Sequence, residues 1–254
     1  MLYFAERYYC FTIPPSTMAR LSVNINKIAL IRNSRKGNLP DLLQAALDCE
    51  AFGAQGITVH PRPDERHVRY SDIPLLKKAV TTEFNIEGNP VEQFMELVLQ
   101  YAPTQCTLVP DAPGVLTSDQ GWDTLKHRTF LTDVVARLHE KDIRVSVFVD
   151  AEERHVEGAK AVGADRIEFY TGNYAALFPD NPAQAVEPHA RCARLANNIG
   201  VGINAGHDLN LDNLRFYKEQ VEGLLEVSIG HALISDALYF GLQNTIQMYL
   251  RLLR

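Results

Sequence analysis

The chain has 254 residues, with 25 Lys and Arg against 31 Asp and Glu, so its formal net charge is −6. Hydrophobic residues make up 46% of the chain, which is ordinary for a folded globular protein. The mild acidity argues against nucleic acid as the main partner, because a surface that binds a phosphate backbone usually carries a clustered basic excess. It still allows a local cationic pocket for a small phosphate ester.

Cysteine spacing and hydropathy indicate the compartment. Cys10, Cys49, Cys106 and Cys192 lie far apart and form no C-x-x-C pair, which indicates neither a disulfide framework nor a structural zinc site. We therefore expect a cytoplasmic protein. No stretch reaches the roughly 18 apolar residues of a membrane span, so we expect no membrane association.

Residues 1–18 differ in character from the rest of the chain. Glu6 and Arg7 interrupt the apolar run, and no small-residue cleavage site follows, so the segment is not typical of a signal peptide. We expect an N-terminal extension here, either an ordered arm or sequence upstream of a native start at Met18. Residues 19–254 then form one catalytic domain.

From residue 21 onward, short β-branched runs alternate with amphipathic stretches. Most of the β-branched runs are nearly continuous in apolar residues, which is typical of parallel strands covered on both faces. The predicted strands are Leu21–Ile25, Gly56–His60, Glu83–Glu87, Gln105–Pro110, Ile143–Asp150, Arg166–Thr171, Gly200–Asn204 and Leu225–Gly230. The predicted helices are Asp41–Phe52, Ser71–Val80, Val91–Tyr101, Asp123–Lys141, Ala151–Val162, Asn181–Ile199, Leu211–Glu219 and His231–Leu253. Eight strands alternating with eight helices predict a single-domain α/β fold, the TIM (β/α)8 barrel.

Polar residues follow the predicted strands, where barrel enzymes carry their chemistry. His60, His207 and His231 lie at strand ends, and imidazole exchanges protons in either direction near neutral pH. Glu87 ends the third strand and is a candidate general base. Each residue also has a structural alternative, because a histidine or carboxylate at a strand end can serve only to hydrogen-bond the backbone.

Two kinds of segment suit phosphate binding. Arg62 lies between two prolines that restrict the backbone, which suits a fixed contact with an anion, although it could be a solvated loop charge. Gly206 permits a close backbone approach, and Gly230-His231 opens the last helix, whose N-terminus attracts anions. Elsewhere we expect Asp150 to cap the helix that follows it.

Seven short motifs carry a family resemblance. In chain order they are Asn24–Ala29, Gly56–Arg62, Asn85–Glu87, Leu108–Pro110, Thr171–Tyr174, Asn204–His207 and Ile229–His231. Together they closely resemble the pyridoxine 5′-phosphate synthase family, from about residue 21 to the end of the chain. Residues 1–18 have no counterpart in that pattern.

The resemblance implies a reaction and a set of roles. The family condenses 3-amino-2-oxopropyl phosphate with 1-deoxy-D-xylulose 5-phosphate to give pyridoxine 5′-phosphate, phosphate and water, with no redox cofactor and no metal. His60 and Glu87 take the positions of proton acceptors, and His207 takes that of a proton donor. The implied substrate-binding residues are Asn24, Asn26, Lys27, Arg35, Arg62, His67, Thr117, Asp208, Gly230 and His231. The resemblance also implies a homo-octamer.

Three positions depart from the family pattern. The family more often has Asp-His where this chain has Asn26-Lys27, which removes a carboxylate and a titrating imidazole. Asp208 replaces a glycine and places a negative charge near a presumed phosphate. The loop that starts at Asp111 lacks a basic pair.

Two other functions remain open from the sequence. A metal-dependent hydrolase on the same barrel could use His60, His207, His231 and Asp150, although strand 2 lacks the H-x-H pair of such sites. A non-catalytic relative that binds phosphate esters is the other alternative, motivated by the three departures.

Overall fold

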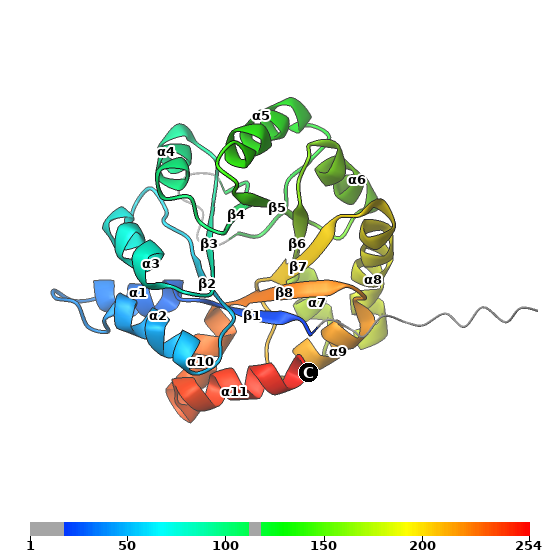
Figure 1. The fold of residues 1–254 in the computed structure, drawn as a ribbon. Coiled ribbons are helices and arrows are strands. Elements are labelled where there is room, and N and C mark those ends of the chain that lie inside the picture. The colour runs from blue at the N-terminus through cyan, green and yellow to red at the C-terminus, as the bar shows by residue number, and fades with distance from the viewer. Residues whose placement is uncertain (1–17, 112–117) are drawn as a thin grey trace, which may run out of the picture.

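Eight strands pair in parallel in chain order, and the eighth returns to pair with the first, which closes a barrel (Figure 1). The computed structural model describes residues 18–111 and 118–254. The strands are β1 (Arg20–Asn24), β2 (Gly56–Val59), β3 (Glu83–Gly88), β4 (Gln105–Leu108), β5 (Arg144–Val149), β6 (Arg166–Tyr170), β7 (Gly202–Gly206) and β8 (Leu224–Ile229). The predicted single-domain TIM barrel is confirmed. Residues 1–17 and Thr117 lie outside the described residues, so the predicted extension stays a prediction.

A ring of helices surrounds the barrel. The helices are α1 (Asn26–Asn33), α2 (Leu42–Ala51), α3 (Ile73–Ala79), α4 (Glu92–Tyr101), α5 (Arg128–His139), α6 (Glu153–Ala161), α7 (Gly172–Leu177), α8 (Pro182–Ile199), α9 (Leu214–Gln220), α10 (His231–Phe240) and α11 (Leu242–Leu252), with a short 3-10 turn η1 (Tyr70–Asp72). The apolar core lies between this ring and the strands. In β5, for example, Val145, Val147 and Val149 alternate along the strand and are fully buried.

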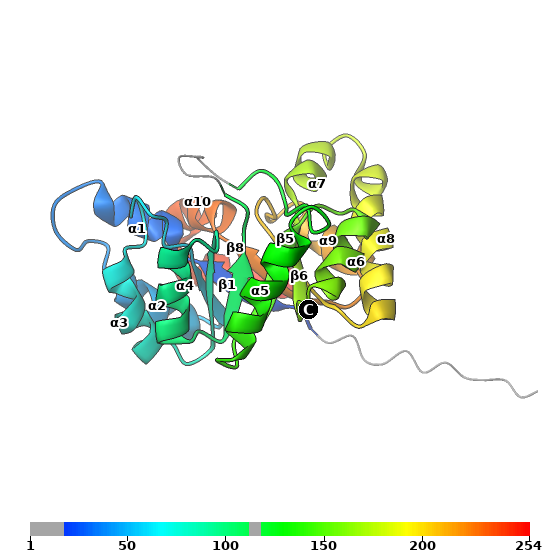
Figure 2. The same cartoon turned by 90° about the horizontal axis from the view of Figure 1, so that it is seen from above.

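The helix predictions need three corrections. The segment after β1 is helix α1, and α7 is a second helix that the sequence analysis missed. The predicted helix His231–Leu253 is two helices, which Gly241 separates. Gly241 has φ +77° and ψ 146°, a conformation that glycine adopts readily and other residues rarely do. Figure 2 shows α1, α7 and α10 at the same end of the barrel.

Polar side chains fill the interior of the barrel. Thr107 on β4 donates to Glu168 on β6 at 3.3 Å, and Gln105 donates to Glu226 on β8 at 3.5 Å. Because these pairs join strands that are not neighbours, the side chains must point inward. The strands are covered on both faces, as expected, but only the face toward the helices is apolar. The apolar residues alternate with polar residues that face the barrel axis.

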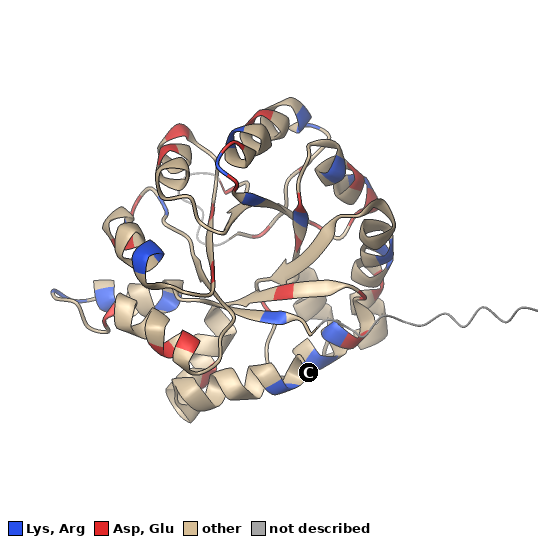
Figure 3. Cartoon of the chain, viewed as in Figure 1, with Lys and Arg blue, Asp and Glu red and all other residues tan. Residues whose placement is uncertain are grey.

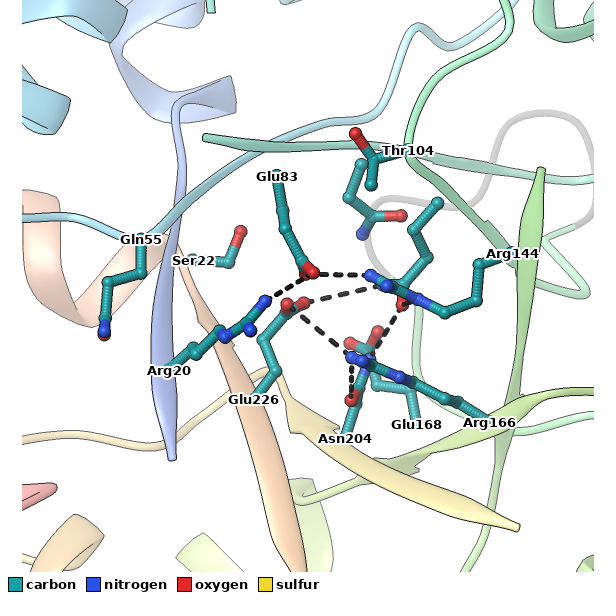
Figure 4. A network of polar contacts seen from close by, with 12 residues as sticks. Arg20, Ser22, Gln55, Glu83, Thr104, Arg144, Arg166, Glu168, Asn204 and Glu226 are labelled. Carbon is teal, nitrogen blue, oxygen red and sulfur yellow. Dashed lines mark hydrogen bonds and ion pairs between the residues drawn. The ribbon is translucent and has the colours of Figure 1, made fainter. Parts of the chain in front are cut away.

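An ion network closes the end of the barrel at which the strands begin. We call Arg20, Glu83, Arg144, Arg166 and Glu226 the floor network, and Figure 4 shows their side chains meeting. Oε1 of Glu83 lies 2.6 Å from Nη1 of Arg20, and Oε2 of Glu83 lies 2.8 Å from Nη2 of Arg144. Burial, and then the hydrogen bond and charge of Glu83, raise the pKa of Glu226. These charges lie at the opposite end from the polar residues that follow the strands.

The outer surface carries charges of both signs. Lys and Arg are interspersed with Asp and Glu over the surrounding helices (Figure 3). Among the described residues, no helix is both long and apolar enough to cross a membrane.

Candidate active site

A cavity of about 430 Å³ opens at the end of the barrel where the strands finish. Side chains from the ends of several strands converge on it, as the sequence analysis expected. The predicted site residues that line it are Asn24, Asn26, Lys27, His60, Arg62, His67, Glu87, His207, Asp208, Gly230 and His231. Of the other predicted residues, Thr117 lies outside the described residues. Arg35 is exposed beyond the end of α1 and does not line this cavity.

His60, Glu87 and Asn24 form one connected group. Nδ1 of His60 lies 3.6 Å from Oε1 of Glu87, and Asn24 Nδ2 donates to the same oxygen at 3.0 Å. Glu87 lies on β3, His60 follows β2 and Asn24 ends β1, so three neighbouring strands fix the group. Glu87 therefore accepts a hydrogen bond from an amide and has an imidazole close by, while it faces the cavity.

Asn26 holds the start of this arrangement. Its backbone N–H donates to Asn24 Oδ1 at 3.0 Å, and its own Oδ1 accepts from the backbone N–H of His60 at 2.9 Å. One amide side chain thus ties the end of β1 to the residue after β2. The departure from a carboxylate at this position leaves an acceptor in place, because the amide oxygen supplies the same hydrogen bond to His60.

Arg62 is buried beside the cavity and pairs with a residue to which the sequence analysis gave no role. Its Nη2 lies 2.5 Å from Oδ2 of Asp111, and Ser118 Oγ donates to the same oxygen at 2.8 Å. Arg62 is 6% exposed, so it is not a solvated loop charge. Asp111 follows the Val109-Pro110 motif, and its place at a strand end was the signal that could have identified it.

His67 lies beside a group of positive charges. Burial first, and then the charges of His60 and Arg62, lower its pKa to about 3. Its Nδ1 accepts from the N–H of Val68 at 3.0 Å, which puts the ring proton on Nε2. His67 is therefore neutral near pH 7 and offers one N–H donor.

His207 follows β7 in a constrained conformation. Its φ is +93°, which non-glycine residues rarely adopt. Nδ1 of the ring lies 2.8 Å from Oδ2 of Asp208, and the ring meets Tyr170 edge-on with centroids 5.2 Å apart. Gly206 precedes His207 and packs closely against the side chain of Glu168. A Cβ on Gly206 would lie 2.2 Å from Oε1 of Glu168.

Glu168 is a second buried carboxyl at the base of the cavity. The sequence analysis placed it on strand 6 but assigned it no function. Burial first, and then the negative charges of Glu87 and Glu226, raise its pKa well above the ordinary value. The raised pKa favours the neutral form of Glu168.

The start of α10 also lines the cavity. Gly230 is its N-cap and His231 its first residue, and both face the cavity. A Cβ on Gly230 would lie 3.1 Å from Cβ of Asn24, so only a small residue fits easily there. The unpaired N–H groups and the dipole of a helix N-terminus favour an anion at this place.

The hydrolase alternative needs Asp150 beside His60, His207 and His231, but only the three histidines line the cavity. Asp150 accepts a hydrogen bond from the N–H of Gly121 at 3.1 Å and lies outside the cavity lining. The expectation that Asp150 caps the following helix is also wrong, since the N-cap of α6 is Glu152. Within residues 18–111 and 118–254, no group of three or more His, Cys, Asp or Glu is arranged to hold a metal ion.

Comparison with known proteins places the chain in a family. The family model described as "Pyridoxal phosphate biosynthesis protein PdxJ" matches residues 21–254. The chain belongs to the PdxJ family. A relative from Christiangramia forsetii named pyridoxine 5′-phosphate synthase is 57% identical over 237 residues, which cover 93% of this chain and 100% of the relative. A relative of the same name from Cytophaga hutchinsonii is 60% identical with the same coverage.

PdxJ family membership confirms the resemblance found in the sequence. The fold itself is shared more widely. The solved structure of 3-keto-L-gulonate-6-phosphate decarboxylase from Vibrio cholerae matches with a TM-score of 0.64 and 10% identity. That match covers 93% of this chain and 98% of the other, and at this identity it shows a common barrel alone.

Proposed function

We propose that the cavity at the barrel mouth condenses 3-amino-2-oxopropyl phosphate with 1-deoxy-D-xylulose 5-phosphate. The products are pyridoxine 5′-phosphate, inorganic phosphate and water. One observation carries the proposal beyond membership of the PdxJ family: His60, Glu87 and His207 all line the same cavity. Joining an amine to a ketone and closing a ring needs several proton transfers, and three acid–base groups around one cavity can supply them.

Glu87 and His60 act as proton acceptors in this proposal. Glu87 receives a hydrogen bond from Asn24 and lies 3.6 Å from His60, so the two groups can remove protons from one end of the bound substrates. His207 acts as the proton donor from β7, on a different side of the barrel mouth. Separate acceptor and donor positions allow proton removal and proton delivery without rotation of the intermediate.

The phosphate groups bind at cationic and amide-rich parts of the cavity. Lys27 and Arg62 supply charge, and the start of α10 at Gly230 and His231 supplies N–H groups. His67 donates through Nε2 and carries no charge near pH 7.

The remaining predicted contacts complete the proposed substrate site. Asn24 and Asn26 orient the acid–base group, and Asp208 borders it beside His207. Arg35 and Thr117 stay proposals from the family pattern.

The chain works in the cytosol as a homo-oligomer, an octamer in this proposal. Leu238, Tyr239 and Phe240 on α10 support an interface, since their apolar side chains are exposed. Size-exclusion chromatography with light scattering tests the assembly: eight times the chain mass supports the octamer, and the mass of one chain overturns it.

Incubation with both substrates tests the reaction. The purified chain is mixed with 3-amino-2-oxopropyl phosphate and 1-deoxy-D-xylulose 5-phosphate, and pyridoxine 5′-phosphate is measured by chromatography. Product formation that requires both substrates supports the proposal. Binding of both phosphate esters without product would leave the non-catalytic alternative as the better description.

A further inference from the structure

The pair formed by His207 and Asp208 goes beyond the roles proposed so far. Nδ1 of His207 lies 2.8 Å from Oδ2 of Asp208, within the range of a strong charge-assisted hydrogen bond. Since both side chains line the cavity, the contact lies at the reaction site itself. The carboxylate therefore has a partner in the protein before any substrate arrives.

We propose that Asp208 is a positioning residue, which holds the His207 imidazole with Nε2 as its proton-exchanging atom. This inference rests on the proposed function, because it assigns His207 the role of proton donor. It differs from a direct substrate contact, since Asp208 acts through the ring of His207. The contact between His207 and Asp208, which we call the dyad, is already formed in this structure.

The hydrogen-bond geometry settles which ring nitrogen exchanges protons. A carboxylate only accepts hydrogen bonds, so the contact with Asp208 requires a proton on Nδ1 of His207. Nε2 is then the atom that gains or loses a proton as the ring changes state. In many acid–base sites, the carboxylate of another residue fixes the tautomer of a histidine in this way.

The ring of His207 is also held on its other sides. Tyr170 on β6 meets it edge-on, and the backbone of His207 keeps φ at +93°. Such a conformation costs free energy and persists only where the surroundings enforce it. Together, the strained backbone, the aromatic contact and the carboxylate leave the imidazole one orientation.

Charge near the pair favours an ionised Asp208. The hydrogen bond from His207 lowers the pKa of Asp208, and the charges of His207 and His231 act in the same direction. Glu168 on the adjacent strand has a raised pKa, which favours its neutral form.

Pairing also removes an electrostatic difficulty. A lone carboxylate beside a bound phosphate ester would repel it, whereas a carboxylate paired with imidazolium is neutral overall. Two other ionisable groups lie near the pair of His207 and Asp208. They are Tyr170, whose pKa is raised by burial and by nearby carboxylates that include Asp119 and Asp150, and His231 at the start of α10. None of them supplies a second strong contact to the Asp208 carboxylate.

Substitution of Asp208 tests the inference by kinetics. Asp208→Asn keeps the size of the side chain and removes its charge. We expect kcat to fall about tenfold, with KM changed less than about threefold. Asp119→Asn is the matched control, because it removes the same charge from an exposed residue that also faces Tyr170.

A double-mutant cycle separates action through His207 from direct action on substrate. In a His207→Gln background, Asp208→Asn should change kcat by less than about twofold, because the group on which Asp208 acts is absent. A full additional loss in that background, or a rise in KM with kcat unchanged in the single variant, would overturn the positioning role.

Nitrogen-15 NMR of labelled histidine gives a readout that needs no turnover. The His207 resonances, assigned by their loss in His207→Gln, should report a proton on Nδ1 in the neutral ring and change tautomer balance in Asp208→Asn. Identical shifts in both proteins would overturn the inference. If the wild-type chain forms no pyridoxine 5′-phosphate while this NMR signature is present, the proposed function fails and the dyad stands.

Discussion

Nδ1 of His60 lies 3.6 Å from Oε1 of Glu87, although His60 follows β2, Glu87 lies on β3, and the two are 27 positions apart in the chain. Parallel pairing of β2 with β3 brings them together, and Asn24 on β1 adds a third contact to the same carboxylate. The barrel thus assembles an acid–base group from three separate segments, each of which ends at the cavity.

Glu87→Gln should remove most of the activity. The amide keeps the shape of the side chain but cannot accept a proton, so we expect the rate of pyridoxine 5′-phosphate formation to fall about 100- to 10,000-fold. Steady-state kinetics with both substrates measures the loss. Glu92→Gln is the matched control, because Glu92 is exposed on α4 and pairs with Arg137 away from the cavity. Full activity in Glu87→Gln would remove Glu87 from the catalytic group.

Arg62→Lys should weaken binding of a phosphate substrate. Lysine keeps the charge but loses the planar donor group that Arg62 shares with Asp111, so we expect KM for at least one substrate to rise about tenfold or more, with a smaller change in kcat. Arg137→Lys supplies the comparison, since its pair with Glu92 is exposed and should leave both constants unchanged. An unchanged KM for both substrates in Arg62→Lys contradicts the assignment.

His67 should make the folded chain less stable in mild acid. Its pKa is about 3 in the folded chain against an ordinary value of 6.5. Between these two pH values, His67 binds a proton in the unfolded chain but not in the folded chain. Stability is therefore lost as the pH falls from 6.5 toward 3. His67→Gln should lose less unfolding free energy between about pH 7 and about pH 5, as measured by urea unfolding. Equal losses in the two proteins would show that His67 titrates normally.

Glu226 should act in the opposite direction. Its pKa is raised above the ordinary value of 4.5, so the folded chain retains a proton that the unfolded chain releases. Stability then declines as the pH rises above that ordinary value. Glu226→Gln cannot ionise and should show a weaker decline in urea unfolding between about pH 5 and about pH 8. A steeper decline in the variant would mean that Glu226 is ionised and stabilised by Arg166.

Gly206→Ala should destabilise the barrel beneath His207. The new Cβ would lie 2.2 Å from Oε1 of the buried Glu168, so one of the two must shift. We expect a loss of about 1–3 kcal/mol in unfolding free energy. Adding Glu168→Ala removes the clash, so the double variant should lose less than the sum of the two single variants. Strict additivity would show that the two residues do not crowd each other.

Much of the fold follows from local pattern in the sequence. The β-branched runs and the glycines that end several helices predict eight strand–helix units, and closure follows from their number. The break at Gly241 was not predictable, because the apolar pattern continues through it and the break depends on one φ angle. The polar interior was also missed, since the pairing of Thr107 with Glu168 requires knowledge of which strands face each other.

The candidate site shows a similar division. Position at strand ends and the family motifs identified His60, Glu87 and His207, which line one cavity. Asp111 and Glu168 received no role, because their importance depends on contacts with Arg62 and on burial beneath the cavity, which strand patterning does not encode. The partner of Asp208 was likewise invisible in the sequence, where adjacent residues need not touch.

Phosphorus NMR of a complete reaction tests the central claim most directly. The wild-type chain is incubated with both phosphate esters, and the signals of substrates and products are followed together. The account predicts one inorganic phosphate for each pyridoxine 5′-phosphate formed, only when both substrates are present. Phosphate release from either substrate alone, or no change in either signal, would contradict a ring-closing condensation in this cavity.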